Sequence, residues 1–123
     1  RSSEDFEKIK EEAVRVLKFI KKMDTSDMIR TLKTLEEYKL NVNDFLDIMM
    51  IWYRDVLLYK ATMDSDAIVF ADEKDSIAKE ASESSYEGIE KVLQILDKTK
   101  ERLKANVNFE LAMELMLLTI KES

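Results

Sequence analysis

The stretch that decides the fold runs from Asn106 to Ile120 and reads NVNFELAMELMLLTI. Its two asparagines can accept hydrogen bonds from the first backbone N–H groups of a helix, so we expect a helix to begin just after them. The residues that follow are apolar on almost every side of that helix. A helix of this kind is stable only deep in a core or against a partner. Either the rest of the domain or another protein must therefore cover it.

The composition favours helices throughout the chain. The 123 residues suffice for one domain with a single core, and they include one glycine and no proline. These two residue types punctuate turns and sheets, and no strand-length run alternates apolar and polar residues between hairpin turns. The sequence predicts an all-α fold, a single helical bundle of five to six helices over residues 1–123.

Apolar residues recur at the three-to-four spacing of helices with a buried side. Ahead of the final helix, this period predicts helices over residues 3–23, 27–38, 44–61, 72–81 and 84–104. Ser84 with Glu87 forms a capping-box pair for the fifth helix, and Asp72 can cap the fourth. The helix over residues 44–61 has the broadest apolar surface, so we expect it at the centre of the bundle.

Several classes of chemistry are excluded. Without histidine or cysteine the chain has no imidazole base, thiolate nucleophile, Cys/His zinc site or disulfide. One glycine cannot form a glycine-rich phosphate loop, and di-metal sites in bundles require a Glu-x-x-His motif that is absent. We therefore expect no catalytic residue, no cofactor and no metal, and the domain is not predicted to be an enzyme.

The charge of the chain bears on its partners. Its 26 acidic and 20 basic residues give a net charge of −6, whereas nucleic-acid binders concentrate positive charge on one face. The cluster of Lys98, Lys100, Arg102 and Lys104 lies near a helix C-terminus, where cations complement the helix dipole. No segment approaches the roughly 20 apolar residues of a membrane span. We expect neither direct nucleic acid contact nor a membrane.

Two features of the apolar helices leave alternatives open. Arg54 and Asp55 interrupt the central helix and point about 100° apart, so they either anchor neighbouring helices or a partner, or lie on the single solvent-exposed edge of the helix. Methionine serves in cores and at adaptable interfaces. Four methionines fall on the two most apolar helices: Met49, Met50, Met113 and Met116. Together these helices carry more apolar surface than a small bundle easily buries, which favours a protein–protein surface.

Two segments resemble a known family. Residues 52–60, WYRDVLLYK, resemble the W-x-R-D-hydrophobic-L helix of bacterial clamp-loader subunits, and residues 106–118 resemble their closing N-x-N-x-x-L-x-x-E-x-L-L-L helix. The separation of the two segments also fits. The resemblance covers most of the chain. It best matches the C-terminal domain of the DNA polymerase III delta-prime subunit, followed by the equivalent gamma/tau domain.

The resemblance implies a helical collar domain, one of several that pack in a ring and hold the clamp loader together during sliding-clamp loading in DNA replication. ATP-hydrolysing and zinc-binding modules would lie upstream, and the parent assembly would be a DNA-binding DNA polymerase holoenzyme, a nucleotidyltransferase, in the bacterial cytoplasm. The implied partners are the gamma/tau and delta subunits. Because the chain begins at Arg1 without methionine, we expect a segment of a longer protein.

The same reasoning gives a set of candidate residues for partner contact or packing. They are Trp52, Tyr53, Arg54, Asp55, Asn106, Asn108, Met113, Glu114, Met116, Leu117 and Ile120. Where these match the family motif, the resemblance implies structural roles in packing, capping and partner contact. The alternative function is a generic helical adaptor that binds an amphipathic partner helix in a groove. A membrane-surface protein would need a basic amphipathic face, which the acidic balance disfavours.

Overall fold

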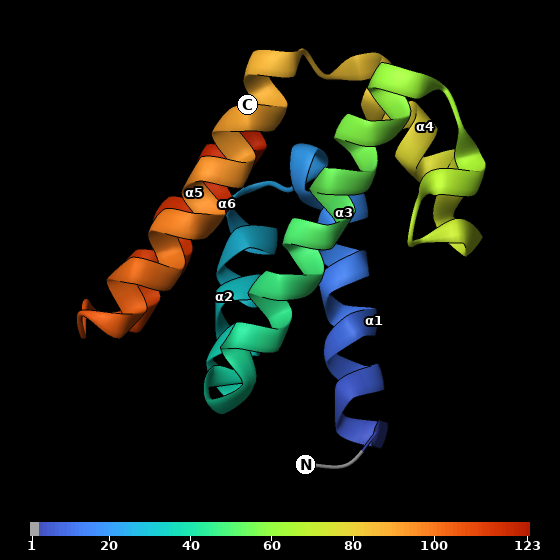
Figure 1. Ribbon diagram of the computed structural model, residues 1–123. Coiled ribbons are helices and arrows are strands. Elements are labelled where there is room, and N and C mark those ends of the chain that lie inside the picture. Colours follow the sequence, from blue (N-terminus) through green and yellow to red (C-terminus); the bar gives the residue numbers. More distant parts are fainter. Residues whose placement is uncertain (1–2) are drawn as a thin grey trace.

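Six α-helices dominate residues 3–123, the part of the chain that the computed structural model describes (Figure 1). Short 3-10 turns join several of them, and these described residues contain no strand. The predicted all-α bundle of five to six helices is confirmed. The helices are α1 (Ser3–Phe19), α2 (Thr25–Glu37), α3 (Val42–Thr62), α4 (Lys74–Glu83), α5 (Tyr86–Lys104) and α6 (Phe109–Glu122).

The centre of the bundle is α3, which packs against α1, α4 and α5 (Figure 1). Most of its apolar residues are buried, as its broad apolar surface predicts. The last two helices, α5 and α6, run side by side in opposite directions, and α2 packs against α6. The far end of α6 is joined to the 3-10 turn that follows α1, since Lys121 Nζ donates to the Lys21 carbonyl at 3.1 Å. Within residues 3–123, no helix is long and apolar enough to cross a membrane.

The first two helices are those predicted, with shifted ends, since α2 begins at Thr25 rather than at residue 27. The helix expected over residues 3–23 ends as α-helix at Phe19 and continues as a 3-10 turn, Ile20–Lys22. Asp24 then begins α2 with a reciprocal capping box. Its Oδ1 accepts from the Asp27 N–H at 2.8 Å, and Asp27 Oδ2 accepts from the Asp24 N–H at 3.1 Å. These bonds fix the direction in which the chain enters α2.

Two predicted caps are wrong. Asp72 lies inside a 3-10 turn, Ala71–Glu73, and α4 begins later without a side-chain cap. Ser84 ends α4 and donates its hydroxyl to Glu80 Oε2 at 2.8 Å, whereas Ser85 caps α5 by accepting from the Gly88 N–H at 3.0 Å. Both serines are extended, so the second is the last residue before the helix and takes the capping role.

Candidate protein-interaction surface

The aromatic residues of the W-x-R-D segment belong to the core. Trp52 and Tyr53 are both buried. The ring centroids of Trp52 and Phe70 are 5.5 Å apart, and the two ring planes form an angle of 57°. Burial, with the charge of Glu80 as a lesser cause, raises the pKa of Tyr53 far above its usual range, so its hydroxyl stays neutral. Neither Trp52 Nε1 nor the Tyr53 hydroxyl has a hydrogen-bond partner within residues 3–123. Both side chains pack inside the domain.

Asp55 and Arg54 have different environments. Asp55 is buried, and its carboxylate accepts from the Val69 N–H at 2.9 Å and from the Phe70 N–H at 2.8 Å. It thereby ties the segment that precedes α4 to α3, and Phe70 enters the core beside Trp52. Arg54 is exposed. Asp55 is therefore an anchor, whereas Arg54 lies on the solvent-exposed edge of α3.

The two asparagines of the closing motif have separate roles in one turn. Asn106 adopts a left-handed conformation with φ 61° and donates its N–H to the Leu103 carbonyl at 3.2 Å. The Val107 N–H then reaches the Arg102 carbonyl at 3.0 Å, which completes a Schellman end for α5. Asn108 begins α6, since its Oδ1 accepts from the Leu111 N–H at 2.9 Å. Asn106 thus ends α5 and Asn108 begins α6, and the short turn between them reverses the direction of the chain.

One side of α6 is entirely internal. The buried residues are Phe109, Ala112, Met113, Met116, Leu117 and Ile120. The candidate residues Met113, Met116, Leu117 and Ile120 therefore pack within the domain, while Glu114 is exposed. Met49 and Met50 of α3 are buried as well. All four methionines of the two apolar helices fill the core.

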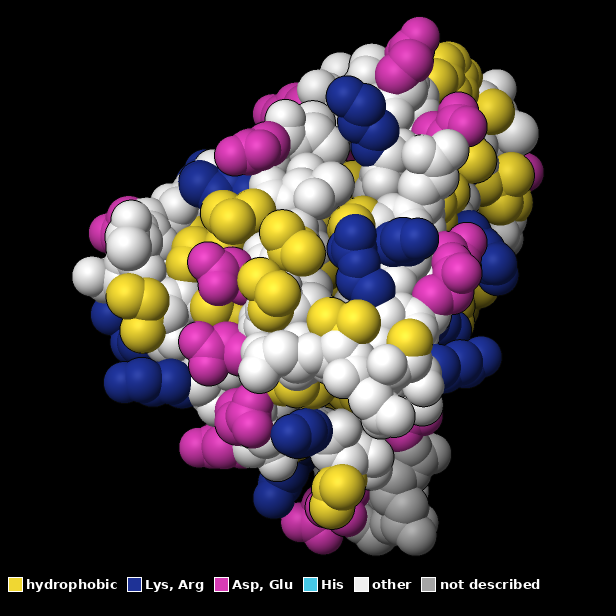
Figure 2. All heavy atoms as spheres, turned by 90° about the vertical axis from the view of Figure 1, so that its left-hand side faces the viewer, with side chains coloured by type: hydrophobic (Ala, Val, Ile, Leu, Met, Phe, Trp, Pro, Cys, Tyr) yellow, Lys and Arg dark blue, Asp and Glu magenta, His cyan; other side chains and the backbone are white. Residues whose placement is uncertain are grey.

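The other side of α6 exposes leucines. Leu111, Leu115 and Leu118 are 50%, 39% and 36% exposed, and they recur at the spacing that aligns side chains along one side of a helix. We call these three residues the α6 leucine stripe. Figure 2, which views the left-hand side of Figure 1, shows hydrophobic side chains gathered on this part of the molecule with acidic side chains between them. The candidate residues chosen from the sequence include none of these three leucines, although the excess of leucine in residues 111–118 signalled them.

The apolar area extends from α6 toward α2. A shallow hollow of about 190 Å³ separates the two helices, lined by Ile29, Leu32, Lys33, Glu36 and Glu110. Ile29 is half exposed and Leu32 is partly buried. An apolar surface with charged residues at its edge has the make-up of a protein–protein contact.

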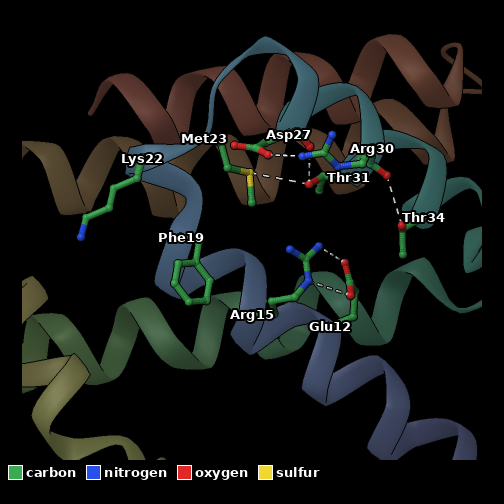
Figure 3. A pocket seen from close by; sticks show the side chains of 9 residues that line it. All are labelled: Glu12, Arg15, Phe19, Lys22, Met23, Asp27, Arg30, Thr31 and Thr34. Atoms are coloured by element: carbon green, nitrogen blue, oxygen red, sulfur yellow. Dashed lines mark hydrogen bonds and ion pairs between the residues drawn. The ribbon is translucent and has the colours of Figure 1, made fainter.

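A polar hollow of about 500 Å³ lies between α1 and α2 (Figure 3). Arg15 forms two hydrogen bonds with Glu12, at 3.1 and 2.5 Å, and Arg30 pairs with Asp27 of its own helix. The hydrogen bonds that Arg15 donates to the Glu12 carboxylate raise the pKa of Arg15. Because these charges are paired within their own helices, the hollow presents a largely neutralised surface.

Within residues 3–123, no group of three or more carboxylates is placed to hold a metal ion. The hydroxyls that line the hollow of Figure 3 bond to the backbone of their own helix, Thr31 to the Asp27 carbonyl at 2.9 Å and Thr34 to the Arg30 carbonyl at 3.1 Å. These side chains stabilise α2.

Comparison with known families identifies the domain. The sequence model of the family described as "DNA polymerase III, delta subunit, C terminal" matches residues 4–122. The chain belongs to this family. No curated protein and no solved structure matches the chain. The expectation of a DNA polymerase III clamp-loader domain is confirmed at the level of the family, and the delta-prime assignment stays a prediction.

As a member of the delta C-terminal family, the chain is a non-catalytic component of a clamp-loader subunit. The family match covers both motif segments, including the buried anchor Asp55 and the turn at Asn106 and Asn108. These three residues shape the domain itself. The α6 leucine stripe, in contrast, is exposed on the surface of the domain.

Proposed function

We propose that this domain is the collar-type oligomerisation domain of a clamp-loader subunit of the delta-prime kind. It would pack against the gamma/tau and delta subunits in the bacterial cytoplasm and hold the ring together while a sliding clamp is loaded. One observation carries the proposal: α6 exposes Leu111, Leu115 and Leu118 on its solvent side in addition to the apolar residues of its core side.

The size of the apolar surface supports a shared interface. Fully burying a leucine stabilises by about 1.5–3 kcal/mol, so covering the half-exposed stripe contributes roughly 1 kcal/mol per residue. A stable interface buries roughly 1,000 Å² or more. Three leucines are too few for that area, so the contact would include Ile29 and Leu32 of α2 across the neighbouring hollow.

The test is assembly measured by size-exclusion chromatography with light scattering. The full 123-residue chain would be run alone and then mixed with the collar domains of gamma/tau and delta subunits from the same organism. We expect a heteromeric peak that is lost in Leu115→Asp, whose circular dichroism stays helical. A strict monomer in every mixture would contradict the assembly role.

Two control variants separate interface from core. Leu117 is fully buried, so Leu117→Asp should unfold the domain because it buries a carboxylate without a partner. Leu40 is 98% exposed and lies outside the stripe, so Leu40→Asp should leave both fold and assembly intact. Loss of assembly in Leu40→Asp would mean that added negative charge, rather than the stripe, controls the contact.

A second candidate function rests on another surface. An apolar hollow of about 390 Å³ lies between α1, α3 and the segment before α4, and its apolar lining residues are Phe6, Val14, Ile48, Ile51, Val69, Phe70 and Ala71. A groove of this kind suits the apolar side of a single partner helix, as the adaptor function requires. Binding of a single amphipathic helix that survives Leu115→Asp but fails in Val69→Asp would favour it. Val69 is well exposed, so that variant should stay folded.

A further inference from the structure

A third surface is positively charged, although the chain as a whole is acidic. It is an open hollow of about 590 Å³ where the turn between α5 and α6 meets the turn between α2 and α3. Its lining residues are Lys39, Val42, Asn43, Lys100, Leu103, Lys104, Asn106, Val107, Asn108 and Phe109. Among these described residues there are three ammonium groups and no carboxylate, although the chain holds 26 acids against 20 bases.

The positive charge of this lysine hollow is only partly neutralised by its surroundings. Lys100 pairs with Asp47 on α3, and Lys39 Nζ lies 3.9 Å from Glu36 Oε1. Lys104 is exposed in the last turn of α5. Ion pairs of exposed side chains are weak, so Lys39 and Lys104 are open to an incoming anion, whereas the partly buried Lys100 would exchange its partner Asp47 for that anion.

The rest of the lining supplies neutral donors and an apolar floor. Asn108 uses its Oδ1 to cap α6, which leaves the N–H groups of its side-chain amide as donors. Val42, Leu103 and Val107 contribute apolar surface. The Schellman turn at Asn106 holds this part of the backbone in place before any ligand arrives, which reduces the entropy lost on binding.

We propose that the lysine hollow binds a short acidic segment of a partner protein. Its carboxylates would pair with Lys39, Lys100 and Lys104, and a neighbouring apolar side chain would rest on the floor. The volume lies in the range of small-ligand sites and suits a few side chains. This site goes beyond the proposed function, because its lining contains none of the α6 leucine stripe and does not depend on clamp-loader assembly.

The observations favour a peptide over a nucleic acid. A phosphate backbone extending beyond the hollow would meet exposed acids that are sequence neighbours of the lining residues, among them Glu101 of α5 and Glu110 of α6. Single-stranded nucleic acids also bind by stacking bases on aromatic rings. The one aromatic residue of the lining, Phe109, is buried, and Lys39 Nζ lies 5.5 Å from its ring centroid. It offers no open face for stacking.

Fluorescence anisotropy and ¹⁵N NMR of the full chain test the proposal. The probe is a short fluorescein-labelled peptide of glutamate, leucine and glycine, with capped ends. We expect saturable binding that weakens with added salt, and backbone amide shifts confined to Val107, Asn108, Phe109 and their neighbours. The same peptide with glutamine in place of glutamate should bind about tenfold more weakly, because it lacks the charge.

Matched variants make the test specific. Lys39→Glu with Lys104→Glu should weaken binding about tenfold or more. Lys8→Glu with Lys91→Glu changes net charge equally at two exposed positions outside the hollow and should leave binding unchanged. Circular dichroism checks the fold of both double variants. Equal loss in both, amide shifts elsewhere, absence of saturable binding, or tighter binding of a thymidine oligonucleotide at the same amides would each overturn the proposal.

Discussion

Asp55 has the largest expected effect of any single polar residue on stability. Replacing it with alanine would leave the buried Phe70 N–H and the neighbouring Val69 N–H without their acceptor. Hydrogen bonds to charged groups contribute about 1.5–3 kcal/mol each, so Asp55→Ala should destabilise the domain by roughly 3 kcal/mol or more. Urea denaturation measures this change.

Two control variants test the anchoring role. Asp55→Asn, which keeps one acceptor oxygen, should lose less stability than Asp55→Ala. Arg54→Ala, at the exposed neighbouring position, should stay within about 0.5 kcal/mol of wild type. Equal losses in all three variants would contradict the anchoring role.

The turn between α5 and α6 gives a second prediction for single residues. Asn106 is left-handed, a conformation that glycine adopts freely and alanine does not, so Asn106→Gly should be neutral and Asn106→Ala should cost about 1 kcal/mol. At Asn108 the side chain itself is needed, and Asn108→Ala should also cost about 1 kcal/mol through the lost cap. Thermal unfolding of the three variants measures these costs. If Asn106→Gly were as unstable as Asn106→Ala, a side-chain contact rather than backbone geometry would explain Asn106.

At the scale of the helix, the stability of α2 should depend on pH through the carboxylate of Asp24, which caps its first turn. The hydrogen bond from the Asp27 N–H lowers the pKa of Asp24 below its ordinary value of 3.8, despite an opposing desolvation effect. A lowered pKa in the folded state means that the ionised carboxylate stabilises the fold. This contribution is present above pH 3.8 and is lost as the pH falls through the folded-state value. NMR titration of the Asp24 carboxyl checks the direction, and Asp24→Asn should remove this part of the pH dependence while keeping a cap. A pKa at or above 3.8 would contradict the capping geometry.

The helices themselves could be predicted from sequence, whereas two aspects of their ends and surfaces could not. The spacing of apolar residues shows which segments are helical. It cannot show which of the adjacent serines Ser84 and Ser85 caps α5, because that depends on where α4 ends. The segment before α4 has no period of its own, and Ile68 and Phe70 are buried because Asp55 holds this segment from a distant position. Leucines on all sides of α6 made an exposed surface predictable. Which of them face outward depends on how α6 packs against α5 and α2.

At the scale of the whole molecule, partner binding should appear as a gain in stability. A partner that covers the α6 leucine stripe binds only the folded domain, and at a concentration about 100 times its Kd it adds about 2.7 kcal/mol. For a domain of this size the corresponding rise in Tm is roughly 10 °C. Differential scanning calorimetry of the chain mixed with gamma/tau and delta collar domains would measure the shift as partner concentration increases.

Leu115→Asp should abolish this rise in Tm, because it places a carboxylate within the apolar contact. The double variant Lys39→Glu with Lys104→Glu should keep it, since the lysine hollow lies outside the stripe. A shift that persists in Leu115→Asp but disappears in the lysine variant would place the subunit contact at the lysine hollow instead.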